Sequence, residues 1–114
     1  MNCNIKAYPL FERELKRLAK RYKSLKKDYA ALLDELTENP MAGVCLSKRL
    51  RKVRMKIAAK GKGKSGGARV ITIVTNVDVE SMEVGLLYVY DKSERESISD
   101  NELLEVVKRN GLFL

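Results

Sequence analysis

The chain has 114 residues, of which 23 are Lys or Arg and 15 are Asp or Glu, so its formal net charge is +8. This length fits one domain with a single hydrophobic core over residues 1–114. The sequence has no His and only two Cys. These counts exclude His-activated nucleophiles, His-ligated metal ions and all-cysteine zinc sites, and we expect neither a metal nor a cofactor.

The first predicted elements are a short strand and a helical hairpin. The strand spans residues 4–8 and ends before Pro9. Apolar residues at spacings of three and four then predict an amphipathic helix. These residues are Phe11, Leu15, Leu18, Tyr22 and Leu25. Ser24 is the expected N-cap of a second helix, and Asn39-Pro40 is expected to end it, because the residue before proline disfavours helical geometry.

After Gly43 the apolar period changes to two, which predicts a sheet in the second half of the chain. In its first strand one face is expected to be buried, and it consists of Val53, Met55 and Ile57. The opposite face then presents three cations in a row, which are Lys52, Arg54 and Lys56. Two strands rich in β-branched residues follow at 69–77 and 84–90, joined by an acidic turn, so the three strands form an antiparallel meander.

A final helix is predicted near the C-terminus. The sequence from Ser99 to Glu102 fits a capping box, and Asn110-Gly111 is a typical helix end. The predicted fold class is therefore α+β. It has an N-terminal strand and a helical hairpin packed on an antiparallel meander of three further strands, with a short C-terminal helix.

The positive charge is concentrated in one third of the chain. Residues 39–77 contain no acidic residue and ten basic ones, whereas the rest of the chain has 13 basic and 15 acidic residues. The ten are Lys48, Arg49, Arg51, Lys52, Arg54, Lys56, Lys60, Lys62, Lys64 and Arg69. Such a concentration is typical of a polyanion-binding face. A disordered basic arm is the alternative, but the interleaved apolar residues favour a regular element.

Residues 60–67 form a glycine-rich segment between two predicted strands. Its glycines match a dinucleotide-binding pattern, but that mechanism requires a helix N-terminus directly after the loop, where this sequence predicts a strand. We therefore do not expect nucleotide binding. Flexible glycines instead allow backbone N–H groups, Lys62 and Lys64 to approach a nucleic-acid backbone closely. An ordinary hairpin connection with solubilising lysines is the alternative.

These motifs together resemble the RelE/ParE toxin superfamily, most closely the RelE/HigB-like toxins of bacterial toxin–antitoxin systems. The resemblance covers nearly the whole chain and is carried by the order of the elements and by the segments 51–56, 63–71 and 86–90. It implies a RelE-like fold and a ribonuclease that enters the ribosomal A site. It also implies metal-independent cleavage of translated messenger RNA by attack of the ribose 2′-OH, and silencing by a cognate antitoxin.

The resemblance also implies roles for individual residues. Arg54 and Lys56 are similar to the paired basic residues of the family's central strand, with Lys56 a candidate general base. Arg69 would bind the scissile phosphate, Lys92 would stabilise it or protonate the leaving 5′ oxygen, and Tyr90 would stack on a base. The other basic residues of 39–77 would contact the RNA. The alternative is a solvated strand face for Arg54, Lys56 and Arg69, a turn position for Lys92 and a core position for Tyr90. No Tyr follows Tyr90 and no His is present, so the general acid and base remain open.

Two other functions fit parts of this pattern. A ParE-like inhibitor of DNA gyrase would share the fold, although it needs no dense array of phosphate-contacting cations. A non-catalytic RNA- or ribosome-binding module would need the charge alone. No apolar stretch suits a signal peptide or a membrane span, so we expect a cytoplasmic protein with Cys3 and Cys45 reduced. Its expected partners are an antitoxin, the ribosome and messenger RNA.

Overall fold

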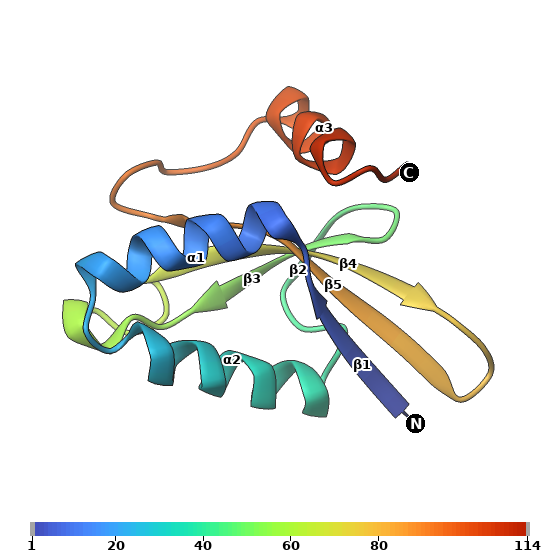
Figure 1. The fold of residues 1–114 in the computed structure, drawn as a ribbon, viewed down its shortest axis with the longest axis horizontal. Coiled ribbons are helices and arrows are strands. Elements are labelled where there is room, and N and C mark those ends of the chain that lie inside the picture. The colour runs from blue at the N-terminus through green and yellow to red at the C-terminus, as the bar shows by residue number, and fades with distance from the viewer. Residues whose placement is uncertain (1, 114) are drawn as a thin grey trace.

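A five-stranded mixed sheet forms the centre of the computed structural model, which describes residues 2–113 (Figure 1). The strand order is β1-β5-β4-β3-β2. The strands are β1 (Asn2–Ala7), β2 (Val44–Ser47), β3 (Leu50–Met55), β4 (Ala68–Asn76) and β5 (Ser81–Asp91). β2, β3, β4 and β5 pair antiparallel in sequence order, as expected of the meander, whereas β1 pairs parallel with β5. The predicted α+β class is confirmed.

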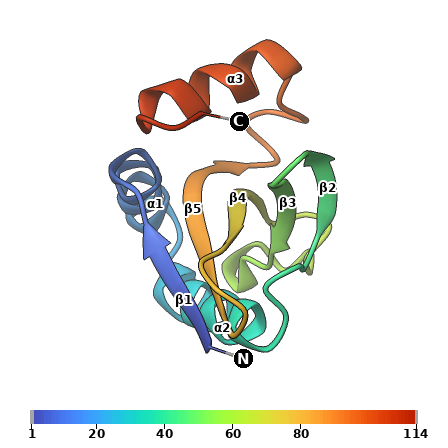
Figure 2. The ribbon, with the colours of Figure 1, turned by 90° about the vertical axis from the view of Figure 1, so that its right-hand side faces the viewer.

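Three helices cover the two faces of this sheet. They are α1 (Pro9–Arg21), α2 (Leu25–Glu38) and α3 (Asp100–Arg109), and Figure 2 shows α3 well separated from α2. One hydrophobic cluster joins α1 and α2 to residues such as Val53 and Val70, and another joins α3 to residues such as Leu50 and Ile71. Successive residues of a strand point to opposite faces, so the sheet separates these two clusters.

The helical hairpin forms as predicted, but its first helix is shorter than the apolar stripe indicated. α1 ends at Arg21, and Tyr22 already has extended geometry with φ −122° and ψ 116°. Tyr22 leaves the helix because its hydroxyl donates a hydrogen bond to the Asp91 carboxylate at the end of β5. Leu25 therefore starts α2, where it is buried in the same cluster as Leu18.

Ser24 occupies the predicted N-cap position of α2 without making a capping hydrogen bond. Its hydroxyl donates to the Asp28 carboxylate at 2.7 Å and accepts the Ala59 N–H at 2.9 Å. Asp28 in turn accepts the Ala58 N–H. These bonds fix a single 3₁₀ turn, Ala58–Lys60, against the start of α2, so the glycine-rich segment begins from an anchored point.

The capping box of α3 is confirmed, since the Ser99 hydroxyl accepts the Glu102 N–H and the Glu102 carboxylate accepts the Ser99 N–H. The helix ends at Arg109, before Asn110 and Gly111, as predicted. The short edge strand β2 is an element that the sequence did not indicate. Three of its four residues are exposed, so it shows no alternation of apolar and polar side chains.

Among residues 2–113, no helix combines the length and the apolar character needed to cross a membrane.

Candidate functional site

Arg54 of β3 and Arg69 of β4 stand directly opposite each other in the sheet, and Tyr90 of β5 continues the same row. Directly opposed residues of neighbouring strands share one face, so the two guanidinium groups lie on the same side. Like charges in this position destabilise each other. Neither arginine forms an ion pair with an acidic residue in the described part of the chain. The pair is therefore a place where a bound anion would relieve repulsion.

Arg69 is held rigidly beneath the glycine-rich segment. Its side chain is 5% exposed, and its guanidinium donates to the carbonyl oxygens of Lys64 at 3.3 Å, Ser65 at 3.0 Å and Ala68 at 3.2 Å. Burial, followed by the nearby Arg54 charge, lowers the pKa of Arg69 from its ordinary value. Arg69 thus shapes the loop and places a fixed positive charge under it.

The loop closes over the end of β3 at Gly67. A Cβ atom at this position would lie 2.2 Å from the Met55 carbonyl oxygen and 2.9 Å from the Ile57 nitrogen. Because both are backbone atoms, neither can move aside cheaply. Gly67 is therefore required for this close approach, which brings the Lys64 backbone within reach of Arg69.

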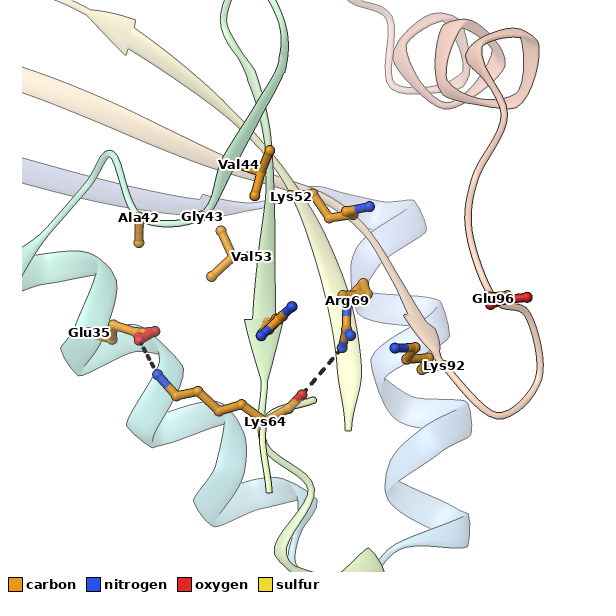
Figure 3. Close-up of a pocket in the computed structure, with 11 residues that line it drawn as sticks. Glu35, Ala42, Gly43, Val44, Lys52, Val53, Lys64, Arg69, Lys92 and Glu96 are labelled. Atoms are coloured by element: carbon orange, nitrogen blue, oxygen red, sulfur yellow. Dashed lines mark hydrogen bonds and ion pairs between the residues drawn. The ribbon is translucent and has the colours of Figure 1, made fainter. Parts of the chain in front are cut away.

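A cavity of about 530 Å³ opens above the arginine pair (Figure 3). Five cations from β3, the glycine-rich segment, β4 and the segment after β5 line it, namely Lys52, Arg54, Lys64, Arg69 and Lys92. The carboxylates of Glu35 and Glu96 also line it, and Figure 3 shows them at opposite sides of the view. Glu35 of α2 accepts a hydrogen bond from the Lys64 ammonium at 2.8 Å. The cavity thus has a strong excess of positive charge and a size suited to a small ligand.

Three of the four predicted catalytic residues, Arg54, Arg69 and Lys92, line this cavity. The fourth, Lys56, lines a neighbouring cavity of about 280 Å³. Arg54 and Lys64 line both cavities, as does Glu35. The predicted stripe of alternate cations, which runs along β3 to Lys56 just after it, therefore lines two adjoining cavities.

Lys60 has a different position from the one predicted. Its ammonium donates to Asp91 at 2.7 Å, with the lysine side chain 9% exposed and the carboxylate fully buried. Burial opposes ionisation of Asp91, but hydrogen bonds from Lys60, Tyr22 and Ser93 outweigh it and hold the Asp91 pKa well below its usual value. This internal pair occupies the Lys60 ammonium, which argues against the predicted contact of Lys60 with RNA.

Tyr90 is also unsuited to the predicted role of stacking on a base. It is 2% exposed and packs in the cluster beneath α3. The Arg95 guanidinium covers its ring, with 5.6 Å between the Arg95 Cζ and the ring centroid. Its hydroxyl is buried without a hydrogen-bond partner in the structure, and burial raises the pKa of Tyr90. An incoming base has no access to this ring.

Three further cations of the predicted set lie away from the arginine pair. Lys48, Arg49 and Arg51 line a separate cavity of about 380 Å³. Arg51 donates to the carbonyl oxygens of Ala42 and Gly43, at 3.2 and 2.9 Å, and so holds the connection before β2. The remaining predicted residue, Lys62, is exposed on the glycine-rich segment.

The two cavity-lining carboxylates are site residues that sequence reasoning missed. A signal was present for Glu35, because it lies three residues after the buried Leu32 and beside the buried Leu36, at the margin of the apolar stripe of α2. Glu96 lies in an irregular segment between β5 and α3, where no periodicity marks it. Within residues 2–113 no group of three His, Cys, Asp or Glu side chains is arranged to hold a metal ion.

No protein-family model matches this chain, and a search of curated proteins found no relative. The fold alone does not imply an activity, so the function has to be inferred from the chemistry of the site.

Proposed function

We propose that this protein is the toxin of a type II toxin–antitoxin system, a ribosome-dependent endonuclease that cuts translated messenger RNA in the A site and so inhibits translation. One observation carries the proposal: the opposed, unpaired arginines Arg54 and Arg69 lie under a cavity that three further cations line. A phosphodiester is the anion of messenger RNA, and arginine can bind it in a bidentate manner. The order of the elements agrees with the fold expected from the RelE-like resemblance.

The site suits a reaction in which the protein stabilises charge. Attack of a ribose 2′-OH on the adjacent phosphate forms a pentacoordinate phosphorane that carries more negative charge than the ground state. Fixed cations such as Arg69 stabilise this transition state without reorganising during the reaction. Arg54, which is exposed on the same face, can bind a second non-bridging oxygen. Lys92 is suited to stabilise the phosphate or to protonate the 5′ oxygen as it leaves.

The positive charge of the cavity also indicates which partners would bind this face. An exposed array of cations steers polyanions to this face and raises the association rate with ribosome-bound RNA. In the resting state the same face is suited to an acidic segment of a cognate antitoxin, which would compete for the cations. We place this activity in the cytoplasm, where translating ribosomes are found. Co-expression with the product of a neighbouring gene should yield a stable complex.

A cell-free translation reaction followed by mapping of messenger 5′ ends tests the proposal. The purified protein should cause cuts within codons only while ribosomes translate. Arg54→Ala should slow cleavage by about 100-fold, because it removes one fixed donor from the transition state. The matched control is Arg13→Ala, which removes the same charge from an exposed position of α1 and should cleave like the wild type.

Two results would contradict the proposal. Intact messenger with undiminished translation would exclude the endonuclease, and a gyrase supercoiling assay would then test the ParE-like alternative. Salt-dependent binding to ribosomes without any cleavage would indicate the non-catalytic module instead.

A further inference from the structure

Attack by a 2′-OH requires a group that accepts its proton. An ammonium or guanidinium group has no free lone pair, so the five cations of the 530 Å³ cavity are suited to bind phosphate or to donate a proton. A carboxylate is an acceptor in its ordinary ionised state. The two carboxylates that line the cavity, those of Glu35 and Glu96, are therefore its candidate proton acceptors.

Glu35 is the better positioned of these two carboxylates. It lies near the end of α2, its side chain is 32% exposed, and the Lys64 ammonium holds one of its oxygens at 2.8 Å. Glu96 is exposed, and its side chain makes no hydrogen bond or ion pair with any residue between 2 and 113. A base must be held within hydrogen-bond reach of the proton that it takes, and only Glu35 is fixed on a rigid element.

The charged groups around Glu35 explain how its carboxylate becomes available to accept a proton. The charged groups that share its two cavities come from its own helix, β3 and the residue after it, the loop, β4 and the segment after β5. They are Asp28, Lys52, Arg54, Lys56, Lys64, Arg69, Lys92 and Glu96. A phosphate that enters beside Arg54 and Arg69 competes with Glu35 for the Lys64 ammonium. Binding of the phosphate thus loosens the ion pair between Lys64 and Glu35, which engages one of the two carboxylate oxygens.

We propose that Glu35 is the general base of the endonuclease, an inference that rests on the function proposed above. The 2′-OH proton passes to a Glu35 carboxylate oxygen while the 2′ oxygen forms a bond to phosphorus. The bond from phosphorus to the 5′ oxygen breaks, and that oxygen takes a proton from the Lys92 ammonium. The products are a 2′,3′-cyclic phosphate and a 5′-hydroxyl, and no oxidant or reductant is needed.

The test is single-turnover cleavage of messenger on programmed ribosomes, measured at a series of pH values from about 5 to about 9. E35Q keeps the size of the side chain but its amide cannot act as a base, so cleavage should slow by about 100-fold. A base-catalysed rate should fall at acidic pH in the wild type, and E35Q should lose this dependence. E38Q is the matched control, because Glu38 lies exposed on the same helix and lines neither cavity.

A binding measurement separates catalysis from structure. The probe is messenger with a 2′-deoxynucleotide at the cleavage position, which binds but cannot react. E35Q removes a negative charge from a phosphate cavity, so it should bind this probe at least as tightly as the wild type while it cleaves more slowly. Lys64→Gln breaks the same ion pair but keeps the carboxylate, so it should weaken binding and retain the acidic limb of the pH profile.

Each remaining outcome decides against the inference. E35Q with the wild-type rate and pH profile would overturn it. Loss of the acidic limb in E96Q rather than E35Q would overturn it in favour of Glu96. If either of these two results is obtained while the wild type cleaves normally, the proposed function stands and only the assignment of Glu35 as the base fails. A wild-type protein that does not cleave would overturn both.

Discussion

Lys60 and Asp91 form a buried ion pair that joins the start of the glycine-rich segment to the end of β5, with 2.7 Å between the ammonium and a carboxylate oxygen. Tyr22 donates to the second carboxylate oxygen, and the backbone and hydroxyl of Ser93 donate to the first. The carboxylate thus joins α1, the loop and β5 at one point. It lies one residue before Lys92, which lines the cavity.

Asp91→Asn should destabilise the fold by about 3 kcal/mol, because it leaves the Lys60 ammonium buried without a counter-charge. Urea unfolding at pH 7 measures this change. Glu94→Gln is the control, since Glu94 pairs with Arg17 at the surface and such pairs contribute about 1 kcal/mol or less. Equal decreases in the free energy of unfolding for the two variants would show that the buried Asp91 pair stabilises the fold no more than a surface pair does.

The lowered pKa of Asp91 predicts that the stability of the fold depends on pH. The pKa of Asp91 is lower in the folded state than in the unfolded chain, where it is about 3.9. Its contribution is therefore fully present above the unfolded pKa and is lost as the pH falls below about 5 towards the folded value. Unfolding free energies measured from pH 7 down to pH 3 should decrease less steeply for Asp91→Asn than for the wild type. Parallel curves would contradict this assignment.

Gly67→Ala should disrupt the loop, because its Cβ would meet a backbone atom of Met55, the last residue of β3, and one of Ile57 just after it. We expect a loss of about 3 kcal/mol or more, with slower cleavage as Lys64 and Arg69 move apart. Gly63→Ala is the comparison. Gly63 has φ +66° but open space around it, so the change should cost only about 1 kcal/mol. Thermal unfolding ranks the two variants, and the reverse order would be inconsistent with the close approach.

Lys48→Gly should stabilise the hairpin between β2 and β3. Lys48 has φ +40°, the one positive φ of a non-glycine residue between positions 2 and 113. Glycine relieves this strain at some cost in chain entropy, so we expect a net gain of about 0.5 kcal/mol, seen as a small rise in Tm. Lys48→Ala removes the same charge but keeps a Cβ atom, so it should show no such gain. A similar rise in Tm for both variants would show that loss of the Lys48 charge, and not relief of backbone strain, stabilises the hairpin.

The corrected set of cations is tested by the salt dependence of binding to single-stranded RNA. Each phosphate contact contributes about 0.7 to the slope of log K against log salt concentration. Arg54→Ala should reduce the slope by about that amount. Lys60→Met should leave the slope unchanged at a temperature where the variant is folded, because this ammonium is paired with Asp91. A reduced slope for Lys60→Met would restore Lys60 to the RNA-binding set.

Periodicity predicted the helices, the meander and the cation stripe because each depends on local spacing. Val53 and Met55 are buried while Arg54 is exposed, as an alternating strand requires. The same spacing cannot show what covers a residue from elsewhere in the chain. Tyr90 is inaccessible because α3, which begins at Asp100, packs over it, and Lys60 is paired with a residue 31 positions away.

Acidic residues of the cavity escaped prediction for a related reason. Positive charge marks only the basic third of the sequence, and Glu35 lies outside it, on α2. Only the packing of α2 beside β3 and the glycine-rich segment brings its carboxylate to Lys64, 29 positions later. Sites built from distant elements combine residues whose local sequence patterns have nothing in common.

The parallel pairing of β1 with β5 has a consequence for the order of events during synthesis. Asn2 lies opposite Ser81 and Ala7 opposite Leu86, so β1 has no partner until the distant strand β5 has been synthesised. Pairings this distant in sequence form slowly, because a long loop must close first. A nascent chain therefore exposes β1 unpaired until β5 has left the ribosome, and the five-stranded sheet can be completed only then.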